Sequence, residues 1–337
     1  MKRLGVVAAM MIAAGCHAAD QPTGAGAEPA GAGEVTGTAA QPIVNGVPAA
    51  PFFSTRAVEV LTNVPTVGTL RCTGTIISPR HVLTASHCDP SPLLVIAGAS
   101  LGTSVKPYGS NTTPSSTPIA VTQVQFAPGV DPSTGQVNDS NGDFADFAVL
   151  TLASTVPATS TVATMAHKYP GEDVTGAMVG AGFHDGNANP TALLKTTTSS
   201  THSDSDGDGY FYLHGDSANM GDSGGPFYFA GLELGVLFGV EWDFGQTAMA
   251  NLYTSVPWHL DTILGMIGFQ TTLHRSLNGG LNGTISQTLS STTERVCSYS
   301  CETSSVCQGY MQSGQTCTMF SSITNSFQLG GSVFGLK

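Results

Sequence analysis

Short apolar runs alternate with clusters of Gly, Pro, Asn and Ser between residues 43 and 268, and this alternation most constrains the fold. Examples are RAVEVLT, CTGTIIS, HVLTAS, FAVLTL and GVLFGVEW. Short β-rich runs bounded by turn residues predict strands, and many of them in close succession predict an all-β barrel or sandwich. Within this range only WHLDTILGMI, at 258–267, has the apolar spacing of a helix.

The charge balance of the chain disfavours nucleic acid as a partner. The 337 residues carry 11 Lys and Arg against 23 Asp and Glu, and 6 of these basic and 18 of these acidic residues lie between 43 and 268. An acidic domain repels phosphate backbones. With 41% hydrophobic and 10% charged residues, the chain is also too apolar to be disordered as a whole.

The N-terminal residues predict export. Met1–Arg3 is positively charged, and Leu4–Ala14 is an apolar stretch too short to span a bilayer, which is typical of a secretory signal. Cys16, in IAAGC, resembles the lipidated cysteine of a bacterial lipobox, with ordinary cleavage just beyond it as the alternative. Residues 17–42 are mainly Ala, Gly, Pro, Thr and Glu and predict a flexible linker or propeptide. We therefore expect a bacterial protein that is secreted or held at the cell surface, with membrane anchoring through Cys16 before activation in the lipidated alternative.

The cysteine count predicts disulfides. If Cys16 belongs to the signal at 1–16, six of the seven cysteines remain, and an oxidising compartment favours three bridges. Four of the six lie in the extension at 269–337, which is too small to hold a core without staples. A zinc site is the alternative there, but the spacing fits no zinc pattern, and the sequence does not choose among the three possible pairings. These four are Cys297, Cys301, Cys307 and Cys317.

The sequence GDSGGP, at 221–226, supplies a candidate nucleophile, Ser223, in a Gly-rich turn. A serine hydroxyl needs a base to take its proton at neutral pH. His87, in LTASHC, follows an apolar strand and precedes Cys88, which can tie its loop to Cys72 by a disulfide. Ser223 and His87 together indicate nucleophilic catalysis.

An imidazole base in turn needs a buried carboxylate to fix its tautomer and stabilise its positive charge. Asp146, in DFADFAVLTL, leads into a buried-looking strand and is the best candidate. Asp143 is the competitor, placed three residues earlier in what we expect to be a solvated loop.

These motifs, together with Ile43-Val44-Asn45-Gly46, resemble the chymotrypsin (trypsin-like) serine protease family over residues 43 to about 268. The resemblance implies two antiparallel six-stranded barrels with the site between them and a C-terminal helix. It implies Ser223 as nucleophile, His87 as general base and then acid, and Asp146 as its orienter, with the N–H groups of Gly221 and Ser223 forming the oxyanion hole. No cofactor is required for this chemistry, and the substrates are proteins or peptides.

The resemblance also bears on specificity and activation. The pocket-base position is Ser217 rather than a carboxylate, and Trp242 and Asp243 stand on the pocket wall, so trypsin-like cleavage is disfavoured, although an acidic wall could still favour a basic residue. In this family a freed N-terminal ammonium, here that of Ile43, pairs with the Asp before the nucleophile, here Asp222. An activating protease is therefore an expected partner.

A second constellation suggests structural calcium. Asp204, Asp206 and Asp208 alternate before a Gly, as at the start of an EF-hand-like loop, but the twelfth position is Gly215 instead of Glu. A solvated acidic turn is the alternative. The run NDSNGD, with Asp139, Asn141 and Asp143, has the same pattern in weaker form, and a plain loop is the favoured interpretation there.

We therefore expect an exported serine endopeptidase with its protease domain at 43–268 and a Cys-rich extension at 269–337. One rival is a catalytically silent homologue that acts as a binding or adhesion module. Another is an esterase or self-processing enzyme that uses the same three residues.

Overall fold

The computed structural model describes residues 43, 46–64, 68–89, 102–110, 112–132, 134, 136–171, 174–182, 195–200, 209–214, 218–242 and 249–337. The signal and linker predicted at 1–16 and 17–42 lie outside these residues. The chain forms two compact units, the first comprising the described parts of Met1–Ala163 and Pro170–Ser255 and the second comprising Thr164–Tyr169 and Val256–Lys337. Among the described residues, no helix has the length and hydropathy needed to cross a bilayer.

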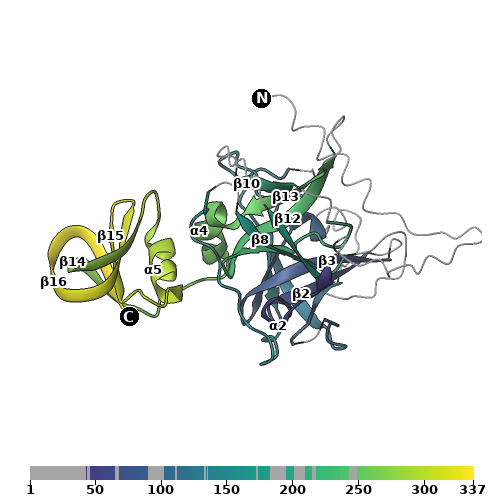
Figure 1. The fold of residues 1–337 in the computed structure, drawn as a ribbon, viewed down its shortest axis with the longest axis horizontal. Helices are drawn as coiled ribbons and strands as arrows, with labels where there is room; N and C mark the ends of the chain where they lie inside the picture. The colour runs from purple at the N-terminus through teal and green to yellow at the C-terminus, as the bar shows by residue number, and fades with distance from the viewer. Residues whose placement is uncertain are drawn as a thin grey trace, which may run out of the picture. The chain divides into compact units, whose positions relative to one another are not determined.

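The first half of the first unit is a closed antiparallel barrel of six strands, in the order β2-β3-β4-β7-β6-β5 (Figure 1). Its interior is filled by β-branched and aliphatic side chains that are fully buried, such as Val58, Ile76 and Leu150. The all-β prediction is confirmed here. The strands are β2 (Ala57–Val64), β3 (Gly68–Ser78), β4 (His81–Thr84), β5 (Gly102–Pro107), β6 (Ile119–Phe126) and β7 (Ala148–Leu152).

The second half of the first unit is an antiparallel sheet in the order β1-β9-β8-β11-β12-β13-β10. Six of its strands, β8 to β13, correspond to the predicted second set of six, and the two-residue strand β1 adds to the edge of β9. Phe211, Phe227 and Tyr253 pack together in its core with ring centroids 5.4 to 6.0 Å apart. The strands are β1 (Val47–Pro48), β8 (Thr175–Gly180), β9 (Lys195–Ser200), β10 (Tyr210–His214), β11 (Pro226–Phe229), β12 (Leu232–Trp242) and β13 (Met249–Ser255).

Two short helical turns accompany these strands. The one-turn helix α2 (Pro51–Ser54) begins with a proline, which suits a first helical position. The 3-10 turn η2 (Ser86–Cys88) directly follows β4. The sequence pattern predicted neither, because segments of three or four residues are too short to show a helical period.

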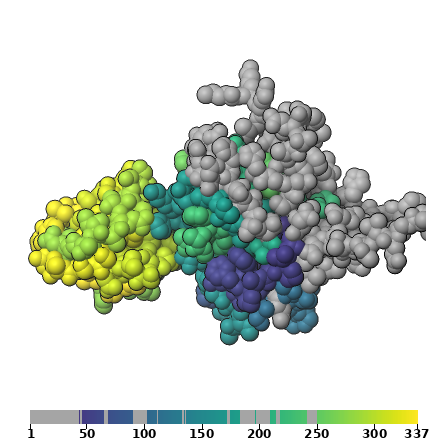
Figure 2. Space-filling model, viewed as in Figure 1, coloured from purple at the N-terminus to yellow at the C-terminus, as the bar shows by residue number. Residues whose placement is uncertain are grey.

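The second unit contains more regular structure than the sequence predicted. Besides helix α4 (Val256–Met266), which was expected, it has β14 (His274–Leu289), α5 (Glu294–Thr303), β15 (Gly309–Ser313) and β16 (Thr316–Leu336). Strands β14 and β16 pair along their length as a long curled ribbon, and β15 pairs with both ends of β16 (Figure 1). In the space-filling view the ribbon and α5 form one closely packed body (Figure 2).

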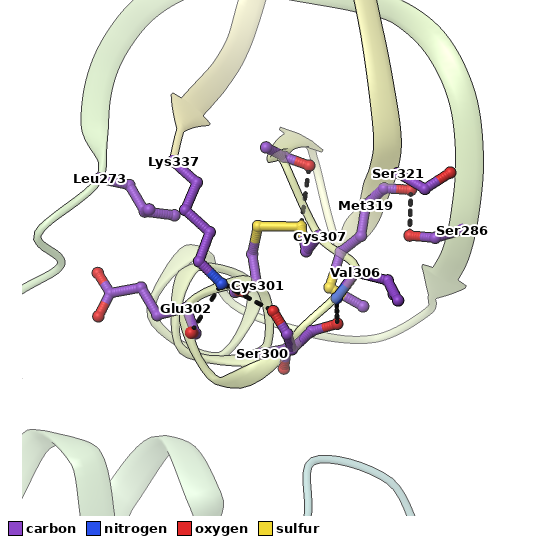
Figure 3. The surroundings of a disulfide bond; sticks show 12 residues. Leu273, Ser286, Ser300, Cys301, Glu302, Val306, Cys307, Met319, Ser321 and Lys337 are labelled. Atoms are coloured by element: carbon purple, nitrogen blue, oxygen red, sulfur yellow. Dashed lines mark hydrogen bonds between the residues drawn. A yellow bond between two sulfur atoms is a disulfide. The ribbon is translucent and has the colours of Figure 1, made fainter.

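Two disulfides staple this unit, as predicted, and the structure selects the pairings Cys297–Cys317 and Cys301–Cys307. All four cysteines are fully buried and form a small core with Tyr310 and Met319. Lys337 donates from Nζ to the carbonyl oxygens of Cys301, Glu302 and Ser304, at 2.7 to 3.4 Å, beside the second disulfide (Figure 3). A cation at this position adds hydrogen bonds to the carbonyls that end helix α5 and complements the negative end of the helix dipole.

Helix α4 belongs by its contacts to the second unit, although the sequence pattern assigned it to the domain at 43–268. The Asp261 carboxylate accepts hydrogen bonds from Thr293 Oγ1 at 2.6 Å and from Arg295 Nη1 at 3.2 Å. The Met165 N–H donates to the Tyr299 hydroxyl at 2.8 Å. The extension is thus built onto α4 and residues 164–169 rather than added after them.

Candidate active site

The barrel brings His87 and Asp146 together at one of its ends. His87 lies in η2, directly after β4, and Asp146 lies just before β7. Because β4 and β7 are antiparallel neighbours with Thr84 opposite Ala148, the end of one strand meets the start of the other. His87 Nδ1 lies 2.9 Å from Asp146 Oδ2. This is the geometry in which a carboxylate fixes the tautomer of an imidazole base.

Asp143, the competing carboxylate, takes part in a loop instead. Its backbone N–H and that of Asn141 donate to Asp139 Oδ1 at 3.1 and 2.8 Å. This is an Asx-type turn, in which the carboxylate of Asp139 accepts hydrogen bonds from the backbone of the residues that follow it. The plain-loop interpretation of NDSNGD therefore fits the structure.

Asp146 is held in place by three donors on its other oxygen. Oδ1 accepts from Ser86 N at 2.7 Å, Ser86 Oγ at 2.5 Å and His87 N at 3.2 Å. Although burial disfavours the anion, the charge and hydrogen bond of His87 and the hydrogen bond of Ser86 hold the pKa of Asp146 below its ordinary value. The carboxylate is therefore ionised at neutral pH.

His87 is a partly exposed base beside an ionised acid. Its side chain is 37% exposed. Burial of the ring lowers the pKa of His87, but the charge of Asp146 and the hydrogen bond to it together outweigh burial and leave the pKa above its ordinary value of 6.5. Because Nδ1 is paired with Asp146, Nε2 is the ring nitrogen that a catalytic base here would present to a nucleophile.

The predicted disulfide Cys72–Cys88 is present and fixes the loop that carries His87. Its two sulfurs and a His87 ring nitrogen lie within 4.8 Å of one another. A thiolate is required for a cysteine to bind metal, so sulfurs joined in a disulfide do not make this group a metal site.

The Gly-rich turn that carries Ser223 is clamped between the two β-structures. Thr73 N, on β3, donates to Ser223 O at 2.8 Å, and Gly224 N donates to Leu237 O, on β12, at 2.7 Å. Gly224 has φ 79, and a Cβ there would lie 2.1 Å from Thr84 Oγ1, so only glycine fits. Cys88 Sγ lies 3.7 Å from Ser223 O. The serine turn and the histidine loop are therefore in contact.

Gly221 carries the backbone through the bend before Ser223. It has φ 91, which favours glycine, and its carbonyl accepts from Thr73 Oγ1 at 3.0 Å. Thr73 Oγ1 also accepts from Ala181 N at 3.0 Å. One buried hydroxyl thus fixes the turn in which the oxyanion hole was predicted.

Asp222, directly before Ser223, is buried and lies beside Ile43. Its carboxylate accepts from Gly182 N at 2.7 Å and from Asn219 N at 2.9 Å. Burial raises the pKa of Asp222 to about 7, and hydrogen bonds from the backbone N–H groups of Asn219, Gly182 and Ile43 oppose the rise. A Cβ at Gly180 would lie 2.1 Å from Asp222 Oδ1, so this side chain needs the glycines of VGAG.

The residues predicted for specificity and calcium are only partly described. Ser217, Asp243 and the three aspartates at 204, 206 and 208 lie outside the described residues, and the backbone of Trp242 pairs with Met249 at the end of β12. Strand β12 contacts the turn of Ser223 at Leu237, before the strand reaches Trp242. Its neighbour Phe238 is buried and stacks on Phe144, with ring centroids 4.2 Å apart.

The sequence analysis missed two contributors to this site. Ser86 supplies both a backbone and a side-chain donor to Asp146, and Thr73 fixes the nucleophile turn. Both are small polar residues inside apolar runs that also contain a motif residue. This position in the sequence could have indicated that they support the site.

A closed six-stranded barrel and a second antiparallel sheet that meet at a Gly-flanked serine define the chymotrypsin-like fold class. The family model described as Trypsin matches residues 43–263, and the chain belongs to the trypsin family.

Solved structures agree on the fold. An HL collagenase structure is 16% identical, covers 68% of this chain and 100% of its own, and has a TM-score of 0.53. Mouse brain neuropsin is 18% identical, with 66% and 99% coverage and a TM-score of 0.50. A scabies mite inactivated protease paralogue is equally similar, at 18% identity, 66% and 98% coverage and a TM-score of 0.50. A search of the curated proteins found no match.

Proposed function

We propose that this trypsin-family protein is an active serine endopeptidase that works through an acyl-enzyme intermediate. The observation that carries the proposal is the His87–Asp146 pair, 2.9 Å apart, beside the clamped turn of Ser223. One structural neighbour is an inactivated paralogue, so the fold alone does not distinguish an active enzyme from a silent one. The preserved pair favours the active one.

In the proposed reaction Ser223 Oγ attacks the scissile carbonyl while His87 takes its proton. Asp146 stabilises the imidazolium without accepting the proton itself. The N–H groups of Gly221 and Ser223 donate to the oxyanion, and His87 then passes the proton to the leaving amine. Water repeats the sequence on the ester and frees Ser223.

We also propose that the protein is made as an inactive precursor. Ile43 is 1% exposed and touches Asp222 through its backbone, and its φ of 47 is unfavourable for a β-branched residue. Cleavage before Ile43 would remove the preceding peptide bond and create an ammonium next to a buried carboxylate that needs a cation. Because the preceding residues are Gln41 and Pro42, the activating protease is not trypsin-like.

Export and anchoring complete the proposal. Lipidation at Cys16 would hold the precursor at a bacterial membrane by the 26 residues from His17 to Pro42, with a reach of roughly 30 Å. Cleavage before Ile43 would then release and activate the enzyme in one event. N-terminal sequencing tests this, since activity in a fraction that still begins at Cys16 contradicts both steps.

The proposed chemistry needs no cofactor, and its partners are protein or peptide substrates. Structural calcium at Asp204, Asp206 and Asp208 remains part of the proposal, because three alternating carboxylates are ligands that Ca²⁺ prefers.

Labelling with a serine-directed fluorophosphonate tests the proposed activity. The activated wild-type protein should be labelled at Ser223, and the Ser223→Ala variant should not. An unlabelled wild-type protein would favour the silent binding module. Parallel assays with peptide and ester substrates separate a peptidase from an esterase.

A further inference from the structure

Ser86 gives Asp146 a hydrogen bond that the backbone alone cannot provide. Its side chain is fully buried, and Oγ lies 2.5 Å from Asp146 Oδ1. The two backbone donors to Oδ1, from residues 86 and 87, would be present with any side chain at position 86. The hydroxyl donor requires serine or a close relative.

The two oxygens of Asp146 have different partners. Oδ1 receives all three donors from the Ser86–His87 segment, whereas Oδ2 faces His87 Nδ1 at 2.9 Å. A carboxylate can rotate about its Cβ–Cγ bond, so a short bond to one oxygen fixes the direction of the other. The hydrogen bond of Thr254 goes to the backbone oxygen of Asp146 and does not restrain this rotation.

We propose that Ser86 is a positioning residue of the triad, which orients the Asp146 carboxylate toward His87. The inference rests on the proposed peptidase function. Ser86 touches neither substrate nor nucleophile, and it acts only through Asp146.

The hydroxyl should affect rate and pH dependence together. A hydrogen bond to a charged group is among the stronger ones, and we expect its loss to lower kcat about tenfold. KM should not change, because substrate does not contact Ser86. The charged groups in this arrangement are Asp146 and His87. Because the hydroxyl aims Oδ2 at His87, its loss should weaken the pairing of the carboxylate with the imidazolium. The pKa of His87 should then fall, and the acid limb of kcat/KM should move to lower pH.

A buried serine elsewhere in the same unit provides a matched control. Ser54 is also 0% exposed, and its hydroxyl has no hydrogen-bond partner among the described residues. Ser86→Ala should lower kcat and shift the acid limb, whereas Ser54→Ala, the same atomic change, should do neither. Threonine and valine side chains have nearly the same shape, but only threonine has a hydroxyl group. The kcat of Ser86→Thr should therefore exceed that of Ser86→Val about tenfold.

Each other outcome decides against the inference. A wild-type kcat in Ser86→Ala, a loss confined to KM, or equal activity of the Thr and Val variants would overturn it. So would a Ser86→Ala protein that fails to fold while Ser54→Ala folds, because the hydroxyl would then be structural. If the wild-type protein is not labelled by fluorophosphonate, the proposed function itself fails, whatever the Ser86 variants show.

Discussion

Asp222 should make the uncleaved precursor less stable as the pH rises. Its carboxyl group is 1% exposed, and burial raises its pKa from the ordinary 3.8 to about 7. The folded precursor therefore binds a proton more tightly than the unfolded chain does. The contribution of this proton to the stability of the precursor is then fully present below pH 3.8 and is lost as the pH rises through 7.

The size of the loss follows from the two pKa values. A difference of one unit between the pKa values of the folded and unfolded states corresponds to about 1.4 kcal/mol. Between pH 5 and pH 8 the folded group gives up its proton near pH 7, so Asp222 should lower the free energy of unfolding by about 3 kcal/mol. Asp222→Asn has no charge to bury and should remove this part of the pH dependence.

Urea unfolding of the precursor at pH 5 and pH 8 measures the effect. The Asp222 and Asp222→Asn precursors should both carry Ser223→Ala to prevent self-cleavage. Between pH 5 and pH 8 the free energy of unfolding should fall by about 3 kcal/mol more in the protein that keeps Asp222. Other buried acids contribute equally to both proteins and cancel in the comparison. Protein cleaved before Ile43 should lack the drop near pH 7, because the ammonium stabilises the charged carboxylate. Equal drops in the precursor pair would refute the reasoning.

Three further outcomes are expected. Glu233 is fully buried and burial raises its pKa to about 8, so Glu233→Gln should reduce the stability lost between pH 5 and pH 8 by about 4 kcal/mol in the same urea assay, and an unchanged loss would contradict the burial argument. The raised pKa of His87 should place the acid limb of kcat/KM above pH 6.5, since only the neutral ring is a base; a midpoint below 6.5 is incompatible with its pairing to Asp146. If Asp206 binds calcium, chelator should lower the melting temperature of the wild-type protein but not of Asp206→Ala, and a melting curve indifferent to chelator would return the loop to a solvated turn.

Local pattern predicted an all-β barrel or sandwich, and the motifs, through the family they resemble, predicted the barrel and the pair His87 and Asp146. The apolar runs of β2, β3 and β7 are buried almost continuously in a closed sheet. Cys72 and Cys88 form the predicted disulfide. These predictions succeeded because an apolar run bounded by turn residues and a fixed motif are both properties of neighbouring residues.

The extension could not be predicted in the same way. Strands β14 and β16 are rich in Ser, Thr, Asn and Gly, and several register shifts interrupt their pairing, so they show no regular alternation. The pairing of four cysteines depends on how the chain returns on itself. Helix α5 did leave a signal, because Thr293 caps it and accepts from Val296 N at 3.3 Å.

The sequence marks Ser86 only as a small polar residue beside a motif histidine and does not show which group its hydroxyl reaches. Its hydroxyl meets Asp146 because β4 pairs with β7 in one particular register. A shift of one residue in that register would change which residue of the turn after β4 lies opposite Asp146. Long-range register, rather than composition, decides which small polar residues support a catalytic group.

The peptide turnover of activated protein, compared with that of Ser223→Ala prepared in the same way, tests the central claim most directly. The substitution removes one oxygen atom and should leave the fold and melting temperature unchanged. The variant should keep less than about a thousandth of the wild-type kcat, because the nucleophile is lost. A folded Ser223→Ala protein that turns over peptide at a rate comparable to wild type would contradict the assignment of this chain as a serine peptidase.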